Sequence, residues 1–113
     1  MNDKTRGLLE YMLEDAQDAA AFAKEAGDFE SFIHDAKTRK AIVMSLLNIG
    51  ELANQLPKEF TDAHTELPWR TMTKMRNIAA HGYHSMSDDI IWDTVQNSVP
   101  ELIRFLRKQL AGE

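Results

Sequence analysis

The sequence has no cysteine, only three prolines and five glycines, and no long apolar run. Without cysteine, the chain can form neither disulfides nor cysteine-ligated metal sites. No apolar stretch approaches the ~18 residues that a membrane-spanning helix requires. Residues 1–15 are charged throughout and lack the apolar region of a signal peptide. These absences argue against export and against the membrane, and we expect a cytoplasmic protein.

The length and composition are those of one small globular domain. The chain has 113 residues, of which 43% are hydrophobic, and we interpret residues 1–113 as a single domain. Its formal net charge of -5 taken alone argues against a nucleic-acid partner, because phosphate binding favours a basic surface. Any interpretation of the chain as a nuclease must answer this objection.

The first half of the sequence predicts two long helices. Apolar residues recur at helical spacing before Gly27, which ends the segment, and Asp28 can cap the short turn that follows. A second apolar stripe runs through about 35–55 and stops at Pro57. Gly50 lies within this stripe, where a residue without a side chain allows close helix packing. Glu51 lies beside the stripe and can pair with a basic residue that the sequence does not identify.

The second half predicts two more helices. Pro68 suits the first turn of a third helix that runs towards His81 and stops at Gly82. A fourth helix opens with Ser87 as its N-cap and keeps its apolar phase across Pro100, which predicts one kinked helix rather than two. No segment alternates as a strand does. We therefore predict an all-α fold, an antiparallel bundle of four main helices.

Histidines and methionines are the first candidates for chemistry, and most have ordinary interpretations. His81 and His84 are three residues apart, but no H-E-x-x-H pattern or helpful carboxylate accompanies them, so we predict no metal site. His34 and His64 lie in polar, turn-like surroundings, where solvation is the better interpretation. Five methionines are interpreted as core residues rather than a cofactor site. They are Met12, Met44, Met72, Met75 and Met86.

The segment RNIAAHGY, residues 76–83, is harder to explain as packing alone. Asn77 and His81 are four residues apart, and Arg76 and Tyr83 are seven apart, so a continuing helix places each pair on one face. An ordinary amphipathic helix end could also carry these residues, with the histidine at the negative end of the helix dipole. Arg70, Lys74 and Arg76 make this helix basic within an acidic chain, which weakens the objection from net charge.

The segment resembles the R-x-x-x-x-H signature of the HEPN superfamily. The segments LLNIGELANQLP, LPWRTMTKMRNIAAHGY and DDIIWDTVQNSVPELI are similar, in the same order, to those of its HepT-like branch. The resemblance covers roughly 8–110 and is weakest before Asp28. Alanines at 79 and 80 and the histidine at 84 depart from the usual pattern, but neither departure removes a candidate catalytic residue.

The resemblance implies a toxin of a toxin–antitoxin pair, acting as a metal-independent ribonuclease without a cofactor. It implies a homodimer in which Arg76 and His81 of both copies face one cleft. It also implies a nucleotidyltransferase antitoxin that attaches AMP to Tyr83, whose ring could instead simply pack in the dimer interface. Histidine can move protons near neutral pH, and arginine can stabilise the crowded phosphate. Asn77, Lys74 and Arg70 are expected to support phosphate binding.

Two alternatives stay open at this point. One is a non-catalytic HEPN module that binds a nucleotide or a nucleotidyltransferase partner. The other is a plain helical dimerisation domain.

Overall fold

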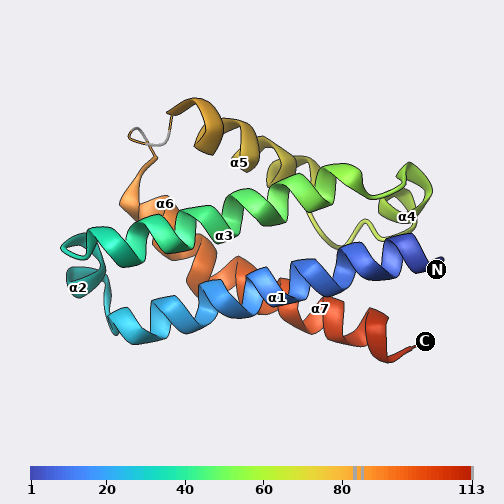
Figure 1. Cartoon of the computed structure of the whole chain (residues 1–113), viewed down its shortest axis with the longest axis horizontal. Helices are drawn as coiled ribbons and strands as arrows, with labels where there is room; N and C mark the ends of the chain where they lie inside the picture. Colours follow the sequence, from blue (N-terminus) through green and yellow to red (C-terminus); the bar gives the residue numbers. More distant parts are fainter. Residues whose placement is uncertain (83, 85, 113) are drawn as a thin grey trace.

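The chain is mostly helical in the region that the computed structural model describes (Figure 1). This region comprises residues 1–82, 84 and 86–112, with only the backbone of 78–81. The helices are α1 (Asp3–Ala26), α2 (Phe29–Ile33), α3 (Ala36–Gln55), α4 (Lys58–Ala63), α5 (Trp69–Gly82), α6 (Asp88–Asp93) and α7 (Val99–Ala111), with a π-helical turn, η2 (Thr94–Ser98), between the last two. No strand occurs in these residues. The predicted all-α fold is confirmed.

The helix ends follow the local sequence. Gly27 adopts φ 90°, a conformation that favours glycine, and its N–H donates to a carbonyl in the last turn of α1. The Asp28 carboxylate then accepts from the Ser31 N–H at 2.8 Å and opens α2. In the same way, Asp35 accepts from the Thr38 N–H at 3.0 Å and caps α3. The Ser31 N–H holds the pKa of the Asp28 carboxyl below its usual range. For Asp35, the Thr38 hydroxyl, which donates at 2.6 Å, and then the Thr38 N–H lower the pKa in the same direction.

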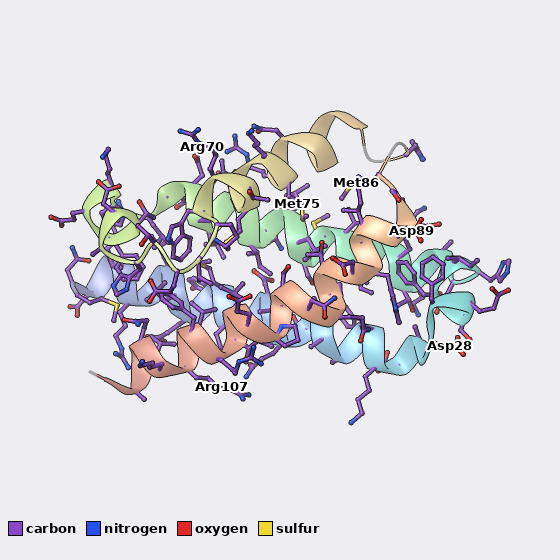
Figure 2. The ribbon with its side chains drawn as sticks, turned by 180° about the vertical axis from the view of Figure 1, so that it is seen from behind. Asp28, Arg70, Met75, Met86, Asp89 and Arg107 are labelled. Atoms are coloured by element: carbon purple, nitrogen blue, oxygen red, sulfur yellow. The ribbon has the colours of Figure 1, made fainter. Side chains whose placement is uncertain are left out.

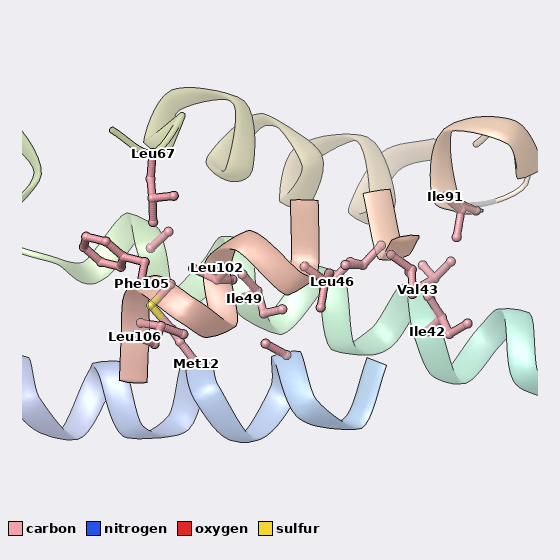
Figure 3. Packing of buried hydrophobic residues seen from close by; sticks show 14 of the residues in the cluster. Met12, Ile42, Val43, Leu46, Ile49, Leu67, Ile91, Leu102, Phe105 and Leu106 are labelled. Carbon is pink, nitrogen blue, oxygen red and sulfur yellow. The ribbon is translucent and has the colours of Figure 1, made fainter. Parts of the chain in front are cut away.

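The long helices run alternately up and down, with α3 between α1 and α5 (Figure 1). Helix α7 packs on α1, so the molecule has a layer of three helices with the last helix behind it. Figure 3 shows side chains of α1, α3 and α7 pointing into one shared core. The largest fully buried side chains are those of Phe32, Leu9, Met12, Ile42, Ile91 and Leu106.

Pro100 shapes the last helix as the sequence predicts, by interrupting it without dividing it. Backbone dihedrals stay helical from Thr94 through Val99, and the Val99 N–H donates to the Thr94 carbonyl in the wide hydrogen bond of a π turn. Proline has no N–H, and its ring clashes with the carbonyl four residues before it. Widening the preceding turn relieves that clash. Ser87 is the N-cap residue of α6, although its side chain makes no capping hydrogen bond.

Two expectations from the sequence are wrong. Met44 is not a core residue, because 57% of it is exposed on α3. His64 is not simply solvated, because its ring packs against that of Phe60, tilted by 41° with 4.5 Å between centroids, and lies 5.5 Å from that of Phe105. The contact of His64 with Phe105 joins parts of the chain that are distant in sequence, which local patterns do not reveal.

None of the described helices is both long enough and apolar enough to cross a membrane.

Candidate functional site around Arg76

Helix α5 carries residues 76–82 of the RNIAAHGY segment and is anchored at its start. The indole N–H of Trp69 donates to the His64 carbonyl at 2.7 Å, and the Met72 N–H donates to the Pro68 carbonyl at 3.0 Å. Figure 2 shows Arg70 on the outer side of α5 and Met75 on the side towards the bundle. The helix therefore presents one face to the core and keeps its cations outside.

Gly50 brings the backbone of α3 against α5. A Cβ built on Gly50 would lie 2.6 Å from the Met72 carbonyl oxygen and 2.9 Å from the Arg76 Cβ. Both distances are shorter than real Cβ contacts, and neither contact is with the flexible end of a side chain. The prediction that Gly50 permits close helix packing is confirmed. The segment that packs against Gly50 is the turn of α5 that carries Arg76.

Glu51, the next residue, is the partner of Arg76. The Arg76 Nη1 donates to the Glu51 Oε2 at 2.9 Å, across 25 positions of sequence. The arginine side chain is 28% exposed and the glutamate side chain 48% exposed. The basic partner of Glu51, which the sequence left open, is therefore the arginine of the motif.

Asn77 holds the same guanidinium from another side. Its Oδ1 accepts from the Arg76 Nε at 3.2 Å and from the Arg76 Nη2 at 2.8 Å. The structure thus brings Arg76 and Asn77 together with Glu51, which sequence reasoning did not assign to the site. The only signal for Glu51 was a carboxylate following a glycine inside a helix.

The sequence predicts four further residues at this site, namely Arg70, Lys74, His81 and Tyr83. Arg70 and Lys74 are exposed on α5, and neither enters an ion pair within the described part of the chain. The backbone of His81 lies in the last turn of α5, while its side chain lies outside the description. Tyr83 lies outside the described residues altogether. That Arg76 and His81 form one catalytic site stays a prediction.

Met86 and Asp88, shortly after the motif, are hydrogen-bonded to α3. Arg39 of α3 donates through Nε to the Asp88 carboxylate at 2.6 Å and through Nη2 to the Met86 carbonyl at 2.7 Å. Helix α3 therefore contacts the chain on both sides of the link between α5 and α6.

A pocket of about 130 Å³ lies between α5 and the η2–α7 segment, over a floor formed by Leu46 and Ile49 of α3. Met72 and Met75 line it, so it is largely apolar, and Arg76 does not. The pocket is therefore separate from the hydrogen-bonded group of Glu51, Arg76 and Asn77. Among the described residues, no three histidine or acidic side chains gather in a way that could hold a metal ion.

Comparison with known proteins identifies relatives over most of the chain. The family described as ribonuclease HepT-like matches residues 12–109. A protein of Methanocaldococcus jannaschii named as a candidate RNase is 35% identical, covering 96% of this chain and 91% of the relative. A candidate RNase of Caldanaerobacter subterraneus is 34% identical, covering 96% of each chain. A protein of Thermococcus cleftensis named as a probable ribonuclease HepT is 38% identical, covering 66% of this chain and 67% of its own length.

No solved structure is significantly similar to this chain.

The helix contact predicts opposite effects of alanine at two helical glycines. Gly50→Ala should lower the free energy of unfolding by ~1–3 kcal/mol, because the new Cβ forces α3 away from α5. Gly7→Ala is the matched control on α1, where a Cβ meets nothing within 4 Å. It should raise stability by up to ~1 kcal/mol through helix propensity. Urea unfolding measures both, and equal stabilisation by the two changes would contradict the close contact.

Proposed function

The chain belongs to the HepT-like ribonuclease family, and we propose that it is a metal-independent endoribonuclease that acts in the cytoplasm as the toxin of a toxin–antitoxin pair. The observation that carries the proposal is the guanidinium of Arg76, which donates hydrogen bonds to Glu51 and Asn77 and belongs to a helix without acidic residues. A fixed cation on a basic surface is what a phosphate-cleaving site requires. The relatives named as ribonucleases support the same activity.

The proposed reaction uses the 2′-hydroxyl of the RNA. A histidine removes its proton, and the 2′-oxygen bonds to the adjacent phosphorus. The bond from phosphorus to the 5′-oxygen then breaks, and the leaving oxygen takes a proton. The products are a 2′,3′-cyclic phosphate and a 5′-hydroxyl. His81 is the proposed proton carrier, and Arg76 stabilises the charge that builds on the phosphate.

Local charge supports binding of RNA by an acidic protein. The chain has a formal charge of -5, yet the helix Trp69–Gly82 carries Arg70, Lys74 and Arg76 and no acidic residue. Arg70 and Lys74 are exposed and supply cations beside the proposed site. An RNA backbone following α5 would meet positive charge first, while the acidic remainder of the surface disfavours binding elsewhere.

We infer a homodimer through the face that carries this site. Met44 precedes Glu51 by seven residues, or about two helical turns, so both lie on one face of α3. Met44 is 57% exposed, and apolar side chains of this kind suit the core of an interface. A symmetric pair would place two Arg76–His81 segments in one cleft, which supplies the second histidine that an acid–base reaction needs.

Arg76→Ala and His81→Ala should each abolish RNA cleavage and growth arrest with helicity intact. The lost Glu51 contact is a partly exposed pair, worth ~0–1 kcal/mol, so melting should change little for the arginine variant. Arg107→Ala, which removes an exposed arginine on α7, is the control and should stay active.

Cleavage of a labelled RNA by the wild-type protein should persist in EDTA and stop when the 2′-hydroxyl at the cut is removed. Normal cleavage by either variant contradicts the mechanism, and partner binding without any cleavage would favour a non-catalytic module.

Met44→Glu should convert the dimer to a monomer and reduce cleavage, because a charge placed in the interface must be desolvated. Ile90→Glu is the control, since Ile90 is 58% exposed on α6, outside the proposed interface. Light scattering over a concentration series distinguishes the two species. A wild-type monomer at high concentration, or a dimer unaffected by Met44→Glu, would contradict the proposed interface.

Tyr83 is the proposed point of neutralisation by a nucleotidyltransferase antitoxin. The phenol oxygen would bond to the α-phosphorus of ATP as pyrophosphate leaves, which places an anion two residues from His81. Coexpression with the partner should add one or more adenylates, found on the peptide that contains Tyr83. Tyr83→Phe should stay toxic and escape this control. An unmodified mass, or a phenylalanine variant that the partner still silences catalytically, would refute this step.

A further inference from the structure

Glu51 is the one acidic residue in the two helices that form the candidate site, α3 and α5. The sequence has 18 aspartates and glutamates. Helices Ala36–Gln55 and Trp69–Gly82 contain only one of them, Glu51, and six lysines and arginines. That single carboxylate contacts Arg76. An anion beside a proposed phosphate site weakens RNA binding by repulsion, so its presence requires a compensating role.

The contacts of the guanidinium indicate that role. Arginine has five N–H donors, one on Nε and two on each Nη. Asn77 accepts from Nε and Nη2, and Glu51 accepts from Nη1. Within the part of the chain that the structure describes, one N–H is therefore left on each Nη, and a phosphate that accepts from these two would displace neither protein group.

The two acceptors fix the guanidinium in different ways. Asn77 follows Arg76 on the same helix, so its amide moves with α5. Glu51 belongs to α3, whose backbone is held against α5 at Gly50. It therefore fixes the guanidinium relative to the rest of the molecule and limits a side chain with high rotamer entropy.

We propose that Glu51 is a positioning residue that holds Arg76 in the orientation needed to stabilise the phosphate during cleavage. This inference rests on the proposed ribonuclease function. Because a fixed donor matters most when charge builds on the phosphate, Glu51 raises the rate of the bound complex, while its negative charge lowers the affinity for RNA.

Kinetics of three variants test this role. Glu51→Ala should lower kcat by about tenfold to a hundredfold, the usual scale for a misplaced catalytic group, without raising KM. Glu51→Gln keeps an oxygen that can accept from Nη1 and removes the negative charge. It should recover most of kcat and bind a 2′-deoxy RNA analogue more tightly than wild type. Glu10→Ala is the control, because it removes a similarly exposed carboxylate that pairs with Arg6 on α1.

Each outcome bears on one proposal. If wild-type protein cleaves RNA and Glu51→Ala matches it within about twofold of kcat, the positioning role is refuted and the ribonuclease function stands. An increase in kcat would also refute it, because Glu51 would then compete with phosphate for Arg76. Equal losses in the alanine and glutamine variants would exclude positioning through this hydrogen bond. Wild-type protein that cuts no RNA refutes the ribonuclease proposal itself and removes the catalytic role of Glu51.

Nuclear magnetic resonance of the arginine side chains tests the hold on Arg76 without RNA. A guanidinium held on both sides rotates slowly about its Cζ–Nη bonds and gives separate Nη hydrogen signals. The signals of Arg76, assigned by their loss in Arg76→Ala, should be separate in wild type and averaged in Glu51→Ala. Averaged signals in the wild type would overturn the inference whether or not the protein cleaves RNA.

Discussion

The close approach of α3 and α5 at Gly50 is the constraint on which the candidate site depends. Helix α5 has α3 as its main neighbour, and a Cβ at Gly50 would lie 2.6 Å from the Met72 carbonyl oxygen. Interiors are packed densely enough that such an overlap must move a helix rather than be absorbed. The position of the Arg76 backbone relative to α3 therefore depends on Gly50 having no side chain.

Three consecutive residues of α3 have three different roles because a helix turns by about 100° per residue. Ile49 is buried in the core, Gly50 meets the backbone of α5, and Glu51 reaches the guanidinium of Arg76. The apolar contacts supply most of the free energy that holds the helices together. The partly exposed ion pair adds little stability, so its main effect is on the direction of the arginine side chain.

Much of the fold can be predicted from the sequence because its signals are local. Gly27 and Pro100 act on the backbone through their own geometry, and the apolar stripes identify the helices. The pairing of Glu51 with Arg76 could not be predicted, since it joins helices 25 positions apart. The exposure of Met44 depends on neighbouring helices in the same way. The motif identified Arg76 and Asn77, whereas their shared hydrogen bonds required the structure.

The acidic net charge and the basic helix are consistent once the position of each charge is considered. Long-range attraction of RNA depends on the potential near α5, where Arg70 and Lys74 are exposed, and solvent and salt screen distant carboxylates. Glu51 is too close to be screened in this way, because its oxygen lies 2.9 Å from Arg76. In the proposed ribonuclease, its charge would lower the affinity of the site for a phosphate. The proposal therefore implies that the orientation of Arg76 limits the function more than the strength of RNA binding does.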